Sequence, residues 1–162
     1  MKGDINMNYE IVILKEKTVV GISARTNNFA PDMGEIIGGL WNRFYNEGIY
    51  NSIPDKTNNK ALGIYTDYDD DKKDNYTVLV ACEVNSNPEN NDSFFVSKIP
   101  EGRYAKFIVK GNMYTAVENA WQKIWQMNLP RTFVCDFEEY QNCDMNNAEI
   151  HIYIGIESKE EK

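Results

Sequence analysis

The segment TFVCDFEEY, residues 132–140, alternates carboxylates with aromatic and apolar side chains. Successive side chains of a β-strand point to opposite faces, so Asp136, Glu138 and Tyr140 share one predicted face. A buried carboxylate must take up a proton, find hydrogen-bond donors or bind a cation, because burial disfavours its charged form. The pattern therefore allows either a solvated strand edge or a cation site at Glu138, where aromatic rings would add cation–π attraction.

The following segment AEIHIYIGIE, residues 148–157, alternates even more regularly. Its even-numbered isoleucines, from Ile150 to Ile156, form one apolar face, and Glu149, His151 and Tyr153 form the other. We expect the two segments to pair as a closing hairpin and Tyr153 to be a candidate ligand-binding residue. His151 has no evident nucleophile and orienting acid, so no catalytic triad is predicted and the histidine is placed at the rim of the site.

Further candidates lie outside this hairpin. Trp121 and Trp125 lie on a predicted amphipathic helix, where an aromatic stripe is usually core but Trp121 could also form a pocket wall. Tyr65 and Glu83 lie on predicted strands of the first half and could face the same groove by internal symmetry, with packing or edge solvation as the alternative. The candidate ligand-binding residues are Glu138, Tyr140, Tyr153, Trp121, Tyr65 and Glu83.

Metal and nucleotide chemistry find no support in the sequence. Asp67, Asp69 and Asp71 have the D-x-D-x-D spacing that opens an EF-hand loop, but position six is Lys72 and position twelve is Val78, where calcium binding needs glycine and glutamate. The chain contains no P-loop, no GxGxxG and no HExxH motif. We expect neither a metal nor a cofactor.

The composition also limits the partners. The 162 residues carry a formal net charge of -8, which would repel phosphate backbones and anionic membrane surfaces, so direct nucleic-acid or membrane binding is not expected. No signal peptide or membrane-spanning stretch is evident. The three cysteines, Cys82, Cys135 and Cys143, are odd in number and irregularly spaced, which favours reduced thiols and a cytoplasmic protein.

The predicted strands and helices that carry these side chains occur in the same order twice along the chain. Strand-like runs and two helices, near 31–47 and 114–127, predict an α+β domain over residues 1–162 with two pseudo-symmetric ββαββ halves, at about 9–85 and 93–157. Trp41 and Trp121 occupy equivalent positions of the two helices. The halves would join in one curved antiparallel sheet, with a central groove where they meet.

Several segments of the chain, taken in order, resemble GyrI-like, or AraC-type, effector-binding domains. Phe137, Glu138 and Tyr140 match the F-E-x-Y pattern of that family, the strand EIHIYIGIE follows it, and FIVKGNMYTAVENAWQKIW resembles the family's strand, turn and second helix. The resemblance covers about residues 9–157. Gly155 departs from the family, which often has proline there. Because only about eight residues precede the first strand, we expect a stand-alone member without a DNA-binding module.

The resemblance implies a protein that senses or sequesters hydrophobic, often cationic, small molecules around Glu138. An enzyme is the alternative, because some GyrI-like proteins resemble hydrolases of strained electrophilic compounds, in which Glu138 would be a general base. A third possibility is a protein-interaction role, since the family name is linked to gyrase inhibition and an acidic surface could mimic DNA.

Overall fold

The computed structural model of the chain describes residues 8–27, 31–69, 75–86, 94–142 and 144–157, so Asp71, Lys72 and Cys143 lie outside the described residues. The elements follow the predicted order, with a short extra helix after the first main one. In chain order they are β1 (Glu10–Leu14), β2 (Lys17–Asn27), α1 (Met33–Asn46), α2 (Ile49–Ser52), β3 (Ala61–Thr66), β4 (Asn75–Val84), β5 (Phe95–Ile99), β6 (Gly102–Gly111), α3 (Met113–Gln126), β7 (Arg131–Tyr140) and β8 (Ala148–Ile156).

Both main helices form where their apolar spacing predicts them. In α1, Leu40 and Phe44 are buried one turn apart, and Gly48 follows the helix in the left-handed conformation that glycine adopts at low cost. In α3, Ala120 and Ile124 are the buried residues at the same spacing. The side chain of Asn112 caps this helix by accepting hydrogen bonds from the first-turn backbone.

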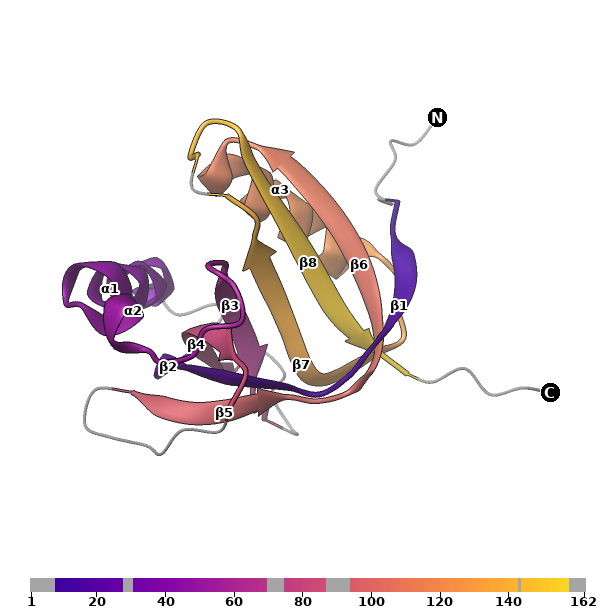
Figure 1. Cartoon of the computed structure of the whole chain (residues 1–162). Coiled ribbons are helices and arrows are strands. Elements are labelled where there is room, and N and C mark those ends of the chain that lie inside the picture. Colours follow the sequence, from indigo (N-terminus) through magenta and orange to yellow (C-terminus); the bar gives the residue numbers. More distant parts are fainter. Residues whose placement is uncertain (1–7, 28–30, 70–74, 87–93, 143, 158–162) are drawn as a thin grey trace.

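The strands form one antiparallel eight-stranded sheet in the order β1-β6-β8-β7-β3-β4-β2-β5. The first strand of each half pairs with a strand of the other half. β1 pairs with β6 of the second half, and β5 pairs with β2 of the first half, as Figure 1 shows at the right and at the bottom. Leu14 pairs with Gly102 and Lys17 pairs with Ile99, so the same register holds on both sides of the β1–β2 and β5–β6 connections. The sheet therefore curls back on itself.

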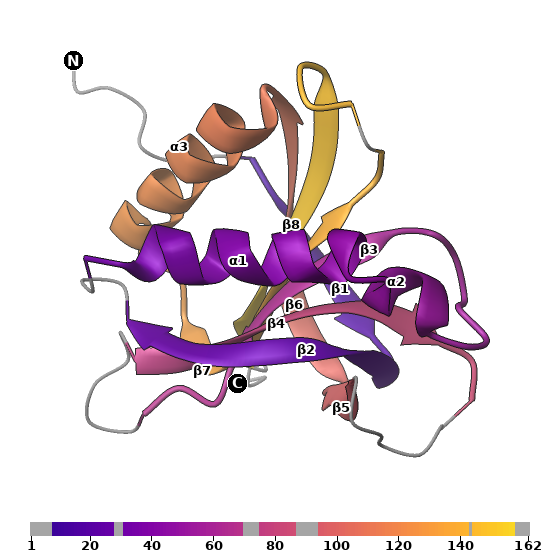
Figure 2. The same ribbon diagram turned by 90° about the vertical axis from the view of Figure 1, so that its left-hand side faces the viewer.

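Both main helices cover the same face of this curled sheet (Figure 2). α1 packs on β2 and β4 around Phe44 and Val80, and α3 packs on β6 and β8 around Ile124 and Ile152. The opposite face has a separate core that includes Phe137. The curved α+β architecture with two pseudo-symmetric halves and two main helices is therefore confirmed.

The two halves meet where β7 pairs with β3, in the middle of the sheet. There Gly63 lies opposite Glu138, and Tyr65 lies opposite Asp136. The predicted alternation of β7 thus brings Asp136 and Glu138 to the helix-covered face and leaves Glu139 on the opposite face. Among the described residues, no helix is long and apolar enough to cross a membrane.

Candidate functional site

Glu138 lies at the centre of the helix-covered face and is almost completely buried, with 2% of its surface exposed. Three aromatic side chains donate hydrogen bonds to its carboxylate. Tyr65 Oη and Trp121 Nε1 donate to Oε2 at 2.9 and 2.7 Å, and Tyr140 Oη donates to Oε1 at 2.6 Å. Four of the six predicted candidate residues are therefore brought together in one cluster.

The aromatic rings around Glu138 also contact one another, and Trp41 joins them. Tyr65 and Trp121 meet edge to face with centroids 5.4 Å apart, and Trp41 of α1 meets Tyr140 in the same way at 5.1 Å. Gly63 allows the carboxylate to come close, because an added Cβ would lie only 3.2 Å from Glu138 Oε1 and 3.4 Å from Trp41. We call Glu138, Tyr65, Trp121, Tyr140 and Trp41 the aromatic cluster.

Burial controls the electrostatics of the aromatic cluster. Desolvation raises the pKa of Glu138 above its ordinary value of 4.5, although the hydrogen bonds from Tyr140, Trp121 and Tyr65 act in the opposite direction. Burial and the nearby Glu138 carboxylate also raise the pKa values of Tyr65 and Tyr140, so both hydroxyls stay protonated and able to donate. No basic side chain among the described residues pairs with Glu138.

The second carboxylate of β7 has a different set of partners. Asp136 is fully buried, and Arg131 Nη2 lies 2.6 Å from its Oδ2 in a salt bridge. Tyr68 Oη donates to the same oxygen at 2.5 Å, and the backbone N–H of Gly155 donates to Oδ1 at 2.8 Å. The guanidinium of Arg131 also lies 4.2 Å from the ring centre of Phe133. Asp136 therefore already has a cation, supplied by the protein.

Two predicted candidates lie on the opposite face of the sheet. Tyr153 pairs with Phe137 in the register and stacks on its ring, with centroids 4.5 Å apart. Glu83 lies opposite Val19 in the same separate core and forms a salt bridge with Lys17 at 3.6 Å. Neither residue reaches Glu138, because the sheet itself lies between them.

His151 and Asp69 each have a partner close by. His151 Nε2 lies 2.7 Å from Glu149 Oε2 on the same strand and on the face opposite Glu138. Asp69 of the D-x-D-x-D segment accepts from Arg25 at 2.5 Å. Cys82 is buried and free, and burial raises the pKa of its thiol to about 12.

Sequence reasoning missed two features of the site. Trp41 was used only to align the two helices, although its equivalence to Trp121 was a signal that it also faces the centre of the sheet. Arg131 could not be connected with Asp136, because the register between β7 and β8 shifts between these two residues and Phe133 has a positive φ of 56°. Simple alternation fails across such an irregularity.

The sequence and the fold were compared with known proteins. A family profile described as Cass2, integron-associated effector binding protein, matches residues 10–156. A search of curated protein sequences finds no significant match.

Solved structures with the same fold include three that match at least 90% of this chain. An integron cassette protein from the mobile metagenome of Vibrio cholerae is 26% identical, with a TM-score of 0.69 over 90% of this chain and 95% of its own. A protein bound to tetraphenylphosphonium is 20% identical, with a TM-score of 0.75 over 93% of this chain and 94% of its own. The EcmrR protein, in a complex with DNA, is 16% identical, with a TM-score of 0.64 over 94% of this chain and 58% of its own.

Proposed function

This chain belongs to the family of integron-associated effector-binding proteins, and we propose that its aromatic cluster binds hydrophobic organic cations with Glu138 as their counter-ion. The family match and the GyrI-like fold support small-molecule binding. The preference for a cation rests on one observation: a buried carboxylate on the helix-covered face has aromatic donors around it and no basic partner among the described residues.

The hydrogen bonds of Glu138 favour a particular kind of cation. Oε2 already accepts two hydrogen bonds and Oε1 accepts one, so little capacity is left for N–H donors of a ligand. A quaternary or delocalised cation needs no hydrogen bond and gains from the charge and from the rings. Each well-placed ring adds about 0.5–2 kcal/mol of cation–π attraction, and burial of the ligand's apolar surface adds a hydrophobic contribution.

Binding requires rearrangement of the aromatic cluster. Glu138 is almost completely covered, whereas the rings around it, Trp41, Tyr65, Trp121 and Tyr140, are only partly buried. Trp41 belongs to α1 and stacks on Tyr45, which is 45% exposed. A shift of Trp41 toward solvent would therefore open a path to the carboxylate.

Tetraphenylphosphonium is a suitable probe, because tetraphenylborate has the same shape and the opposite charge. We expect the cation to raise the melting temperature, since a ligand at 100 times its Kd stabilises the folded state by about 2.7 kcal/mol. Glu138→Gln should weaken cation binding about tenfold or more, which corresponds to about 1.4 kcal/mol. Tetraphenylborate should not bind to the wild-type protein.

Glu139→Gln is the matched control, because it removes the same charge from the adjacent residue, whose side chain points to the opposite face and is bonded by Gln141. This variant should bind the cation like the wild type. Equal weakening by both substitutions, or equal binding of the cation and the anion, would show that Glu138 is not the counter-ion.

The same experiment distinguishes a receptor from a hydrolase. A general base needs a free lone pair directed at a water molecule next to the substrate, whereas the oxygens of Glu138 are held by aromatic donors. We expect mass spectrometry to recover ligands unchanged after incubation with the protein. Turnover of a strained or activated compound that Glu138→Gln abolishes would favour the enzyme instead.

A further inference from the structure

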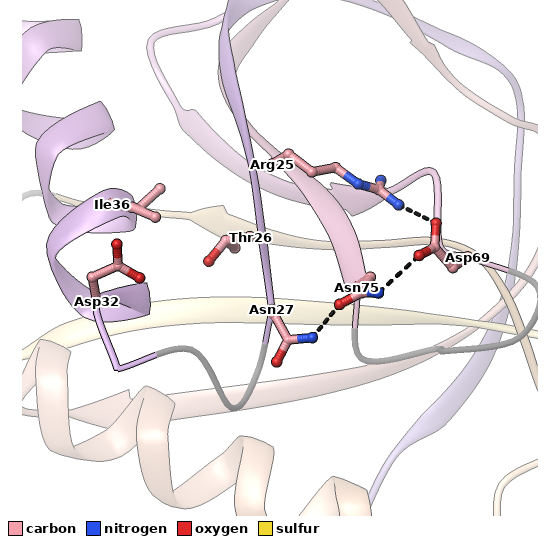
Figure 3. A pocket seen from close by; sticks show the side chains of 7 residues that line it. All are labelled: Arg25, Thr26, Asn27, Asp32, Ile36, Asp69 and Asn75. Carbon is pink, nitrogen blue, oxygen red and sulfur yellow. Dashed lines mark hydrogen bonds and ion pairs between the residues drawn. The ribbon is translucent and has the colours of Figure 1, made fainter.

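A separate pocket lies at the end of the sheet, where β2 and β4 meet the start of α1 (Figure 3). We call it the α1 pocket. Its volume is about 380 Å³, within the range of small-molecule sites. None of the side chains that line it is bonded to Glu138, so it is distinct from the aromatic cluster.

On one wall of the α1 pocket, the charged side chains of Arg25 and Asp69 pair with each other. Arg25 Nη2 lies 2.5 Å from Asp69 Oδ1 in a salt bridge. Asn75 Nδ2 donates to the other Asp69 oxygen at 2.8 Å, and Asn27 Nδ2 donates to Asn75 Oδ1. The three dashed contacts in Figure 3 form this chain. The charges of Arg25 and Asp69 balance each other, so this wall offers polar groups without a net charge.

The other wall has an unused buried hydroxyl. Thr26 is only 7% exposed, and its Oγ1 has no hydrogen-bond partner among the described residues. It ends the row of β2 side chains that point toward α1, in which Val20 and Ile22 precede it. A buried hydroxyl without a partner destabilises the folded protein, and valine would fill nearly the same volume.

The rim next to Thr26 carries the negative charge of Asp32. Asp32 precedes the first turn of α1, but its side chain caps no backbone N–H. No donor among the described residues reaches this exposed carboxylate, which lines the α1 pocket beside Ile36. With the opposite wall neutralised, Asp32 gives the pocket a net charge of about -1.

From these groups we propose that the α1 pocket binds a compact hydroxylated primary ammonium compound, of the size and chemistry of an amino sugar. The ammonium group would donate to Asp32 and, after a small shift of the side chains that cover it, to the buried Thr26 Oγ1, because it carries three donors and both oxygens accept. The hydroxyl groups of the ligand would bond to the side-chain amides of Asn27 and Asn75. Ile36 would pack against the C–H face of the ring.

Glucosamine is the probe, with glucose and N-acetylglucosamine as neutral counterparts, slightly below neutral pH where its amino group is charged. We expect glucosamine to shift the backbone amide resonances of Thr26, Asp32 and Ile36 with a Kd of about 1 mM or tighter. The two neutral sugars should bind at least about fivefold more weakly. Absence of these shifts, or equal binding of the three sugars, would overturn the proposal.

Asp32→Asn should weaken glucosamine binding about threefold to fivefold, the range expected for an exposed ion pair. Glu35→Gln is the matched control, since it removes the same charge from the first turn of α1 at a residue that does not line the pocket. Equal weakening by both variants would reduce the effect to general electrostatics and would contradict the assigned role of Asp32.

Thr26→Val distinguishes a role of the hydroxyl in ligand binding from a role in the stability of the fold. The variant should raise the melting temperature of the free protein, because a methyl group replaces the unpaired hydroxyl, and should weaken glucosamine binding about fivefold. A lower melting temperature would show that the hydroxyl supports the fold, which contradicts the proposal. Glu138→Gln should leave glucosamine binding unchanged, and Thr26→Val should leave tetraphenylphosphonium binding unchanged, so either site can fail independently of the other.

Discussion

Asp136 and Glu138 lie two residues apart on one strand, point to the same face and are both buried, yet their partners differ in charge. Asp136 pairs with Arg131 and accepts from Tyr68. Glu138 accepts from three neutral aromatic donors. Among the described residues, a buried carboxylate with its own cation thus lies next to one without a cation.

This difference indicates how an external cation could be held at Glu138. The Asp136 site combines a carboxylate, a tyrosine donor, a positive group and a ring under that group, since the Arg131 guanidinium lies over Phe133. The aromatic cluster has the carboxylate, the donors and the rings, but the positive group is absent from the described residues. In our proposal the ligand supplies it.

Arg131→Met tests the internally paired site and should have the largest effect. It leaves Asp136 buried without its cation, and loss of one partner from a buried pair typically costs about 3–5 kcal/mol. We expect urea denaturation to show a loss of this size, largely recovered in the Arg131→Met/Asp136→Leu double variant. Wild-type stability of Arg131→Met would mean that the pair contributes little, and the contrast with Glu138 would lose its basis.

Tyr140→Phe tests the cation-free site. It keeps the ring and removes the donor to Glu138 Oε1, so the ionised carboxylate loses a charge-assisted hydrogen bond worth about 1.5–3 kcal/mol. Titration calorimetry should show tetraphenylphosphonium binding weakened by a corresponding amount. Tyr68→Phe makes the same change at Asp136 and should leave the affinity unaltered. Equal effects of the two variants would indicate that the carboxylates are not functionally distinct.

The third prediction concerns pH. The folded-state pKa of Glu138 is raised above 4.5 by burial, so its contribution to stability is fully present below pH 4.5 and is lost as the pH rises through the folded pKa. Cation binding needs the charged form and should strengthen in that same window, by up to about tenfold, or about 1.4 kcal/mol, per pH unit. Calorimetry across this range should show proton release on binding. Glu138→Gln should abolish both dependences.

Substitutions on the opposite face should have the smallest effect. Tyr153→Phe and Glu83→Gln change residues that the sheet separates from Glu138. Each should alter tetraphenylphosphonium affinity by less than about 0.5 kcal/mol. A larger loss in either variant, without a change in the melting temperature, would show that the ligand is bound on the face that carries Phe137.

Strand alternation was sufficient to predict part of the aromatic cluster. It placed Glu138 and Tyr140 on one face, and the structure joins them by a hydrogen bond. The helical spacing likewise located Trp121 on α3, from which its indole reaches Glu138. These relations were predictable because each depends on the regular geometry of a single strand or helix.

The positions of the other candidate residues depend on how distant strands pair in the sheet. Alternation divided β8 into two faces but could not tell which face aligns with Glu138, and the register places Tyr153 beside Phe137. The symmetry argument for Glu83 failed for the same reason, because its side-chain direction depends on pairing with β2. Composition and spacing do not determine the register between distant strands.

The exchange of first strands between the two halves also affects how the chain can fold. Glu10 pairs with Lys106, which is 96 residues later, and contacts of such separation slow folding because a long loop must close before they form. Until β5 and β6 have been synthesised, β1 has no neighbour and β2 has an open edge, which are surfaces prone to pair with other chains. The first half of the nascent protein must therefore remain incomplete while the ribosome produces the second.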